Sequence, residues 1–176
     1  MNDFRIAEAF INAFYSPRVS DKSDSIELAC LMKQKLNIKN NLEKYLNFHH
    51  SQSQKIFKNI EEATNLSFPQ LYIETIRKHI TFGTYQLKQC YGYLAEHFKK
   101  NGRFKSKITE QNIPEENDKI LLSEIHSRHS NNVVYKVFVK YVPNSNNYDT
   151  LEWICSCKSG RRTVGCCTHV ASVIIT

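Results

Sequence analysis

The stretch Cys155-Ser-Cys157-Lys-Ser-Gly-Arg-Arg-Thr-Val-Gly-Cys166-Cys167-Thr-His169 decides how the C-terminal part of this chain folds. It contains two short pairs of soft ligands, Cys155 with Cys157 and Cys167 with His169, separated by nine residues. Structural zinc sites use four such ligands in a closed tetrahedron, with thiolate sulfur and imidazole nitrogen as the usual donors. Alternate side chains of a strand share a face, so a C-x-C pair at a strand end converges on one ion. Two glycines let the intervening loop turn back. The stretch therefore predicts a Zn²⁺ site.

The order C-x-C, a short gap and then C-x-H resembles the signature of the SWIM-type zinc finger, in which hydrophobic residues follow the histidine. The resemblance covers about residues 133–176, and it implies the ligand set Cys155, Cys157, Cys167 and His169. The same stretch is similar to a subset of these fingers found in uncharacterised animal proteins associated with transposable elements. A weaker likeness to those proteins extends over residues 68–128, and residues 1–65 show none. SWIM fingers as a family are implied to contact DNA or proteins.

The cysteines allow two other interpretations. Cys155 and Cys157 could form a strained disulfide, or Cys166 and Cys167 a vicinal one, but the chain shows no secretory signature that would favour disulfides. Cys166 is also a rival for Cys167 as a ligand. The C-x-H pattern favours Cys167, which would leave Cys166 as a core or neighbouring thiol.

The composition is that of a folded chain, because 41% of its residues are hydrophobic and 11% are aromatic. No apolar run approaches the ~18 residues that span a membrane, and the N-terminus has no signal-peptide pattern. We therefore expect an intracellular location and no membrane partner. The net charge of +7 and the pI of about 9.1 permit contact with nucleic acid without establishing it. If DNA is the partner, the location is nuclear.

Apolar spacing predicts helices in the first half of the chain. Residues 3–15, 26–38, 42–46 and 56–60 have helical periodicity, and we leave this region, 1–65, without a function. Two further helices are expected over residues 71–80 and 85–98, separated by a break at Phe82-Gly83-Thr84. The aromatic rings of Tyr85, Tyr91, Tyr93 and Phe98 lie within the second of them; they could stack nucleobases, but their helical spacing favours core packing.

The pattern changes to that of strands after Arg103. Residues 104–108 alternate, and strands are expected at 120–125, 133–142 and 151–155, followed by a short helix at 170–175. Asn131-Asn132 suits a tight hairpin between the strands at 120–125 and 133–142. The fold class is therefore α+β, with an N-terminal helical region, a small antiparallel β-meander and a C-terminal zinc finger. By sequence we divide the chain into 1–65, 66–132 and 133–176.

The chemistry of the predicted site is structural. A zinc ion held by three thiolates and one histidine has no open position for an activated water. The chain also has no glycine-rich phosphate loop and no nucleophile motif. We therefore expect a binding module and not an enzyme.

Three cations lie between the ligand pairs, where they are suited to phosphate contact: Lys158, Arg161 and Arg162. Three surface cations are common, however, and it is the resemblance to transposable-element-associated proteins that makes nucleic acid, DNA above all, the expected partner. Two alternatives stay open: a protein–protein adaptor that uses the N-terminal helices, and a non-catalytic remnant of a transposase-like protein.

Overall fold

The computed structural model describes residues 24–48, 57–60, 66–99, 104–109, 118–130, 132–160 and 164–176. The helix predicted over residues 3–15 lies outside these ranges. In the described part of the chain, no helix has the length and the apolar character needed to cross a membrane.

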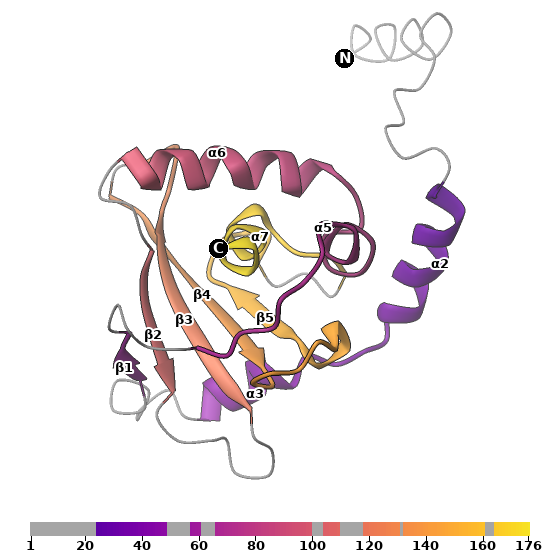
Figure 1. The fold of residues 1–176 in the computed structure, drawn as a ribbon, viewed down its shortest axis with the longest axis horizontal. Coiled ribbons are helices and arrows are strands. Elements are labelled where there is room, and N and C mark those ends of the chain that lie inside the picture. The colour runs from indigo at the N-terminus through magenta and orange to yellow at the C-terminus, as the bar shows by residue number, and fades with distance from the viewer. Residues whose placement is uncertain are drawn as a thin grey trace, which may run out of the picture.

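The centre of the fold is one antiparallel sheet of five strands, arranged in the order β1-β2-β3-β4-β5 (Figure 1). Each strand pairs with the next one along the chain, so the predicted meander is confirmed and is longer than expected. The strands are β1 Phe57–Asn59, β2 Lys105–Thr109, β3 Lys119–His126, β4 Val134–Tyr141 and β5 Glu152–Cys155. Strands from all three sequence segments join in this sheet, and the division into segments stays a prediction.

The longest ladder joins β3 and β4, and it places the core residues on one face. Leu121 lies opposite Val139 and Ile125 opposite Tyr135, so their side chains point to the same side. Val137, Val139 and Tyr141 are fully buried, which confirms the alternation predicted for residues 133–142.

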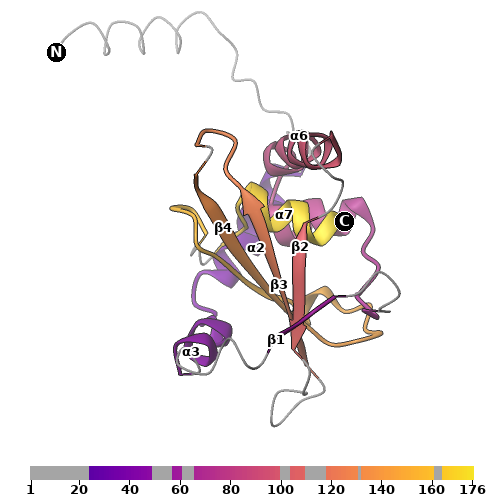
Figure 2. The ribbon, with the colours of Figure 1, turned by 90° about the vertical axis from the view of Figure 1, so that its left-hand side faces the viewer.

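Helices cover the buried face of the sheet in two layers. The last helix, α7 (Thr168–Ile175), packs against β4 and β5, and α6 (Tyr85–Lys99) packs on α7 (Figures 1 and 2). Before α6 come one turn of α-helix, α5 (Ile73–Thr75), and a π-helical segment, η1 (Ile76–Thr81). Phe82 then adopts φ +51° and ends the segment, as the predicted break requires. Six of the eight residues of α7 are buried, and they include the polar residues His169 and Ser172.

The N-terminal helices pack at the β5 side of the molecule. They are α2 (Ser25–Lys35) and α3 (Asn41–Phe48). Before α3, the side-chain amide of Asn40 donates to the Trp153 carbonyl at 2.9 Å. The Leu42 amide donates to the Glu152 carboxylate at 2.8 Å, and the Leu42 side chain is buried. Arg77 of η1 forms an ion pair with Asp24 at 2.6 Å, which holds the start of α2.

Two sequence predictions are wrong in this part of the fold. The helix expected over residues 56–60 is strand β1, because Phe57 pairs with Thr109 of β2 and packs its ring near that of Phe138. The centres of the two rings are 6.1 Å apart. These partners are distant in sequence, and they override the local helical pattern. Tyr85 and Tyr91 were expected in the core, yet they are 69% and 53% exposed.

Candidate metal centre

The first ligand pair is positioned by a tight turn at the end of β5. The Cys155 amide donates to the Gly160 carbonyl at 3.2 Å, and the Gly160 amide donates to the Cys157 carbonyl at 2.9 Å. A side-chain Cβ on Gly160 would lie 2.0 Å from the Cys155 carbonyl oxygen, so only glycine fits this position. The turn therefore closes on itself and directs both thiols to one side.

The second pair is positioned by the start of α7. Cys167 is the N-cap residue in extended conformation (φ −81°, ψ 166°), and His169 lies in the first turn. Because α7 is anchored by its apolar residues against β4 and β5, its N-terminus is fixed beside the end of β5. The predicted zinc ligands thus come from two elements that the core already brings together.

The structure brings all four predicted ligands into one group. The ligand atoms of Cys155, Cys157, Cys167 and His169 lie within 4.8 Å of one another. His169 Nδ1 is 3.8 Å from Cys155 Sγ and 3.8 Å from Cys167 Sγ. Zn–S bonds of about 2.3 Å and Zn–N bonds of about 2.0–2.1 Å in a tetrahedron place such atoms roughly 3.5–3.8 Å apart. The group fits a metal ion with little rearrangement.

Burial and protonation also favour a bound cation. Cys155 is fully buried, and Cys167 and His169 are each 7% exposed. A hydrogen bond with Cys155, and to a smaller extent one with His169, lowers the pKa of the Cys167 thiol to about 4. The same hydrogen bond, together with burial, raises the pKa of Cys155. Burial is the main cause of the raised pKa of Cys157. Three thiolates gathered in one buried place require a positive charge at their centre.

Cys166 lies outside the ligand group although it precedes Cys167 directly. It is 2% exposed and belongs to the main hydrophobic core. All six cysteines are free thiols, so both disulfide alternatives are wrong. Cys166 therefore has the core position that the sequence assigned to it.

A buried tyrosine orients the histidine of the ligand group, a role that no sequence pattern indicated. The Tyr93 hydroxyl lies 3.1 Å from His169 Nε2, and the two rings meet edge to face at a centroid distance of 5.0 Å. Since Nδ1 faces the sulfurs, the geometry assigns the proton to Nε2, which donates to the tyrosine oxygen. Burial raises the pKa of Tyr93, so its hydroxyl stays neutral.

The tyrosine is itself held from the other side. The Arg128 guanidinium lies 5.1 Å from the centre of the Tyr93 ring, and it forms an ion pair with Glu96 at 2.8 Å. A chain of contacts thus runs from the metal ligands through α6 to the turn after β3. No spacing pattern could reveal it, because Tyr93 and His169 are 76 residues apart in the sequence.

Of the three predicted nucleic-acid-binding residues, the structure describes one. Lys158 is exposed in the turn that follows Cys157, while Arg161 and Arg162 lie outside the described residues. A further cation that the sequence did not single out, Lys136 of β4, is also exposed. Its backbone binds Ser156 twice: its carbonyl accepts from the Ser156 amide at 3.0 Å, and its amide donates to the Ser156 hydroxyl at 2.9 Å. Lys136 is therefore fixed beside the turn of residues 155–160 that carries the first ligand pair, called the metal turn below.

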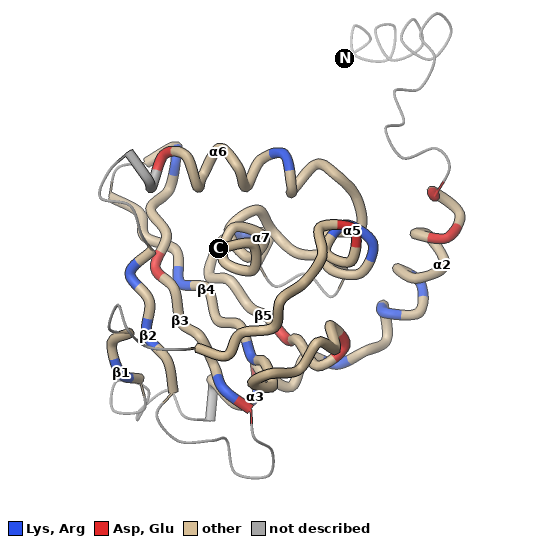
Figure 3. Tube along the Cα trace, in the orientation of Figure 1, with Lys and Arg blue, Asp and Glu red and all other residues tan. Residues whose placement is uncertain are grey.

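Positive charge is otherwise distributed widely. Figure 3 places lysine and arginine on α2, on the turn around η1 and on several strands, with acidic residues among them. The charge of the described residues alone therefore selects no binding face.

Comparisons with protein-family models, with curated protein sequences and with solved structures give no match to this chain. The likeness to SWIM-type fingers consequently remains a resemblance of the ligand spacing.

Proposed function

We propose that this chain is a zinc-stabilised binding module of the SWIM type, and that the turn between its ligand pairs contacts DNA. The observation that carries the proposal is the buried group of three thiols and one imidazole, whose donors are those that zinc prefers. When bound, the ion would supply folding free energy and neutralise the thiolates. All four of its positions would be filled by protein, which is why we propose a structural role and no catalysis.

The zinc part of the proposal is tested by metal content. Purified protein should contain one zinc per chain. Cys155→Ser should lose the ion, whereas Cys166→Ser should keep it, because Cys166 lies outside the ligand group. Full zinc occupancy in Cys155→Ser, or equal loss in both variants, would contradict the assigned ligands.

The DNA part is supported by two exposed cations close to the metal turn. Lys158 follows Cys157 directly, and the backbone of Lys136 is hydrogen-bonded to Ser156, which lies between Cys155 and Cys157. Exposed lysines, one on the turn and one on the neighbouring strand, suit phosphate contact without base recognition. Binding of this kind would place the protein in the nucleus, and the free thiols of all six cysteines suit that reducing compartment.

The test is the salt dependence of binding to an arbitrary DNA duplex. Affinity should fall steeply with salt, and Lys158→Gln should weaken binding and reduce the slope of log K against log[salt] by about 1. The matched control is Lys33→Gln, which removes an exposed lysine from α2. Equal effects of the two substitutions would show that binding depends only on the total charge of the protein. The turn between the ligand pairs would then not be the DNA-binding face.

A second candidate function, a protein–protein adaptor, is favoured by the outer surface of α2. Met32 and Leu36 lie four residues apart and are 41% and 57% exposed, and Ile26 is also exposed. Apolar residues at this spacing form a helix face suited to a partner helix. Self-association that Met32→Lys and Leu36→Lys abolish, in protein without DNA affinity, would favour the adaptor.

A further inference from the structure

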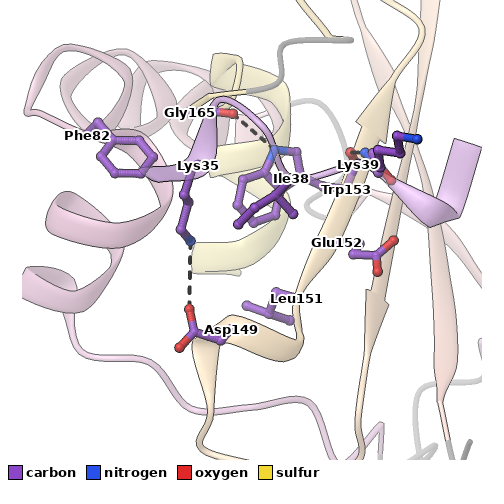
Figure 4. A pocket seen from close by; sticks show the side chains of 10 residues that line it. Lys35, Ile38, Lys39, Phe82, Asp149, Leu151, Glu152, Trp153 and Gly165 are labelled. Atoms are coloured by element: carbon purple, nitrogen blue, oxygen red, sulfur yellow. Dashed lines mark hydrogen bonds and ion pairs between the residues drawn. The ribbon is translucent and has the colours of Figure 1, made fainter. Parts of the chain in front are cut away.

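A cavity of about 310 Å³ lies between the end of α2, the link to α3 and the start of β5 (Figure 4). Its walls also include the turn after η1 and the glycine that precedes the second ligand pair. The apolar part of its lining consists of Ile38, Phe82, Leu151 and Trp153. The volume is at the lower end of the range found for small-molecule sites.

The indole of Trp153 is held rigidly at this cavity. Its N–H donates to the Gly165 carbonyl at 3.2 Å, and its backbone carbonyl accepts from the Asn40 side chain at 2.9 Å. Gly165 therefore holds the ring, and Asn40 of the α2–α3 link holds the backbone of the same residue. A rigid aromatic ring beside an open cavity is a surface on which a flat ligand can stack.

Some charged groups of the cavity have an ion-pair partner among the described residues and one has none. Glu152 accepts from the Leu42 amide at 2.8 Å and pairs with Lys140 at 3.1 Å. Lys35 lies 3.8 Å from Asp149, and Figure 4 shows the two side chains pointing toward each other. Lys39 is exposed, and within the described ranges its ammonium makes no ion pair. Once the paired charges are set aside, the cavity offers one cation and an aromatic wall.

We infer that this cavity binds an unpaired nucleotide, with its base against Trp153 and its phosphate at Lys39. Every base has a flat face that stacks on an aromatic ring, and this stacking tolerates any sequence. The phosphate supplies the anion that the lysine lacks. The choice of ligand rests on the proposed nucleic-acid function. A free mononucleotide and a nucleotide within a single strand share the required chemistry.

The test uses the intrinsic fluorescence of Trp153, which is the only tryptophan in the chain. Zinc-loaded full-length protein is titrated separately with adenosine monophosphate, a short single-stranded oligodeoxyadenylate and a blunt DNA duplex. Saturable quenching by the mononucleotide, the single strand or both supports the inference, and the arm that saturates identifies the source. Absence of quenching by both, or quenching by the duplex alone, overturns it.

Two variants decide whether the cavity is the site. Lys39→Gln should weaken the single-strand or mononucleotide affinity about tenfold, since it removes a charge-assisted hydrogen bond, and Lys33→Gln should leave it unchanged. Equal behaviour of the two variants would overturn the site. Lys158→Gln should reduce duplex binding and leave the quenching intact, so failure of the proposed DNA face and failure of the cavity give different results.

Discussion

The β3–β4 hairpin and the loop that joins β5 to α7 hold their shapes in different ways. The hairpin has eight paired residue positions, and its buried face is filled by aliphatic and aromatic side chains. The loop is closed by two backbone hydrogen bonds around Gly160 and by the ligand group itself. The hairpin is thus stabilised by pairing and burial, whereas we expect the loop to gain its stability from a cation bound by its thiols.

Removal of zinc should produce the largest difference in stability between the hairpin and the loop. With a chelator, amide exchange should rise first in residues 156–160 and 164–167, while amides of β3 and β4 keep their protection. The reason is that the loop loses its central ion, and the hairpin loses none of its pairing partners. Hydrogen exchange read by mass spectrometry measures both regions in one sample. Simultaneous loss of protection in hairpin and loop would show that the metal supports the whole fold and would break the comparison.

Substitution of Gly160 should damage the loop without touching the hairpin. The new methyl group of Gly160→Ala would meet the Cys155 carbonyl at 2.0 Å, which forces the backbone of the turn to move. We expect a loss of about 2–3 kcal/mol in the free energy of unfolding, together with weaker zinc binding, measured by denaturant titration and metal competition.

The matched control is Gly92→Ala in α6. There the methyl group would lie 3.0 Å from the end of the Arg128 side chain, which can move away, and alanine favours the helix. This variant should be nearly neutral. If both variants lose the same stability, the turn has no special need for glycine.

How much the sequence predicts differs between the same two regions. The ligands of the loop follow from local spacing, and the strands of the hairpin follow from alternation, since both signals lie within a few residues. Strand β1 was predicted as helix because its evidence lies in β2 and in Phe138, far along the chain. The Tyr93 contact to His169 was missed for the same reason: no local pattern marks the residue that will meet a ligand from a separate helix.

Loss of the Tyr93 hydroxyl should weaken zinc binding while the fold stays intact. Tyr93→Phe keeps the ring in the core but removes the acceptor that orients His169. Groups of this kind typically change metal affinity about 10- to 100-fold. Competition with a chromophoric chelator measures the affinity, and circular dichroism checks the fold.

Tyr91→Phe is the control for this effect, because Tyr91 lies on the same helix and its ring is exposed. Its zinc affinity should equal that of the unsubstituted protein. An unchanged affinity in Tyr93→Phe as well would mean that α7 alone fixes the histidine, and the loop would be more independent of α6 than the contact suggests.

The smallest effect at neutral pH is expected in the hairpin, at Tyr141. Its hydroxyl donates to the Leu66 carbonyl at 2.7 Å, and burial raises its pKa to about 12 from the usual 10.0. A folded-state pKa above the unfolded value means that the stabilising contribution is complete below pH 10 and is lost as the pH rises toward 12.

Tyr141→Phe should cost about 1 kcal/mol near pH 7, yet the stability of this variant should fall less steeply than that of the unsubstituted protein between pH 10 and 12. Denaturant titrations across that range, with Tyr72→Phe at an 84% exposed position as the control, measure the difference. Parallel curves for all three proteins would mean that the ionisation of Tyr141 is not coupled to unfolding, and the hydroxyl would then contribute to the hairpin only through its hydrogen bond.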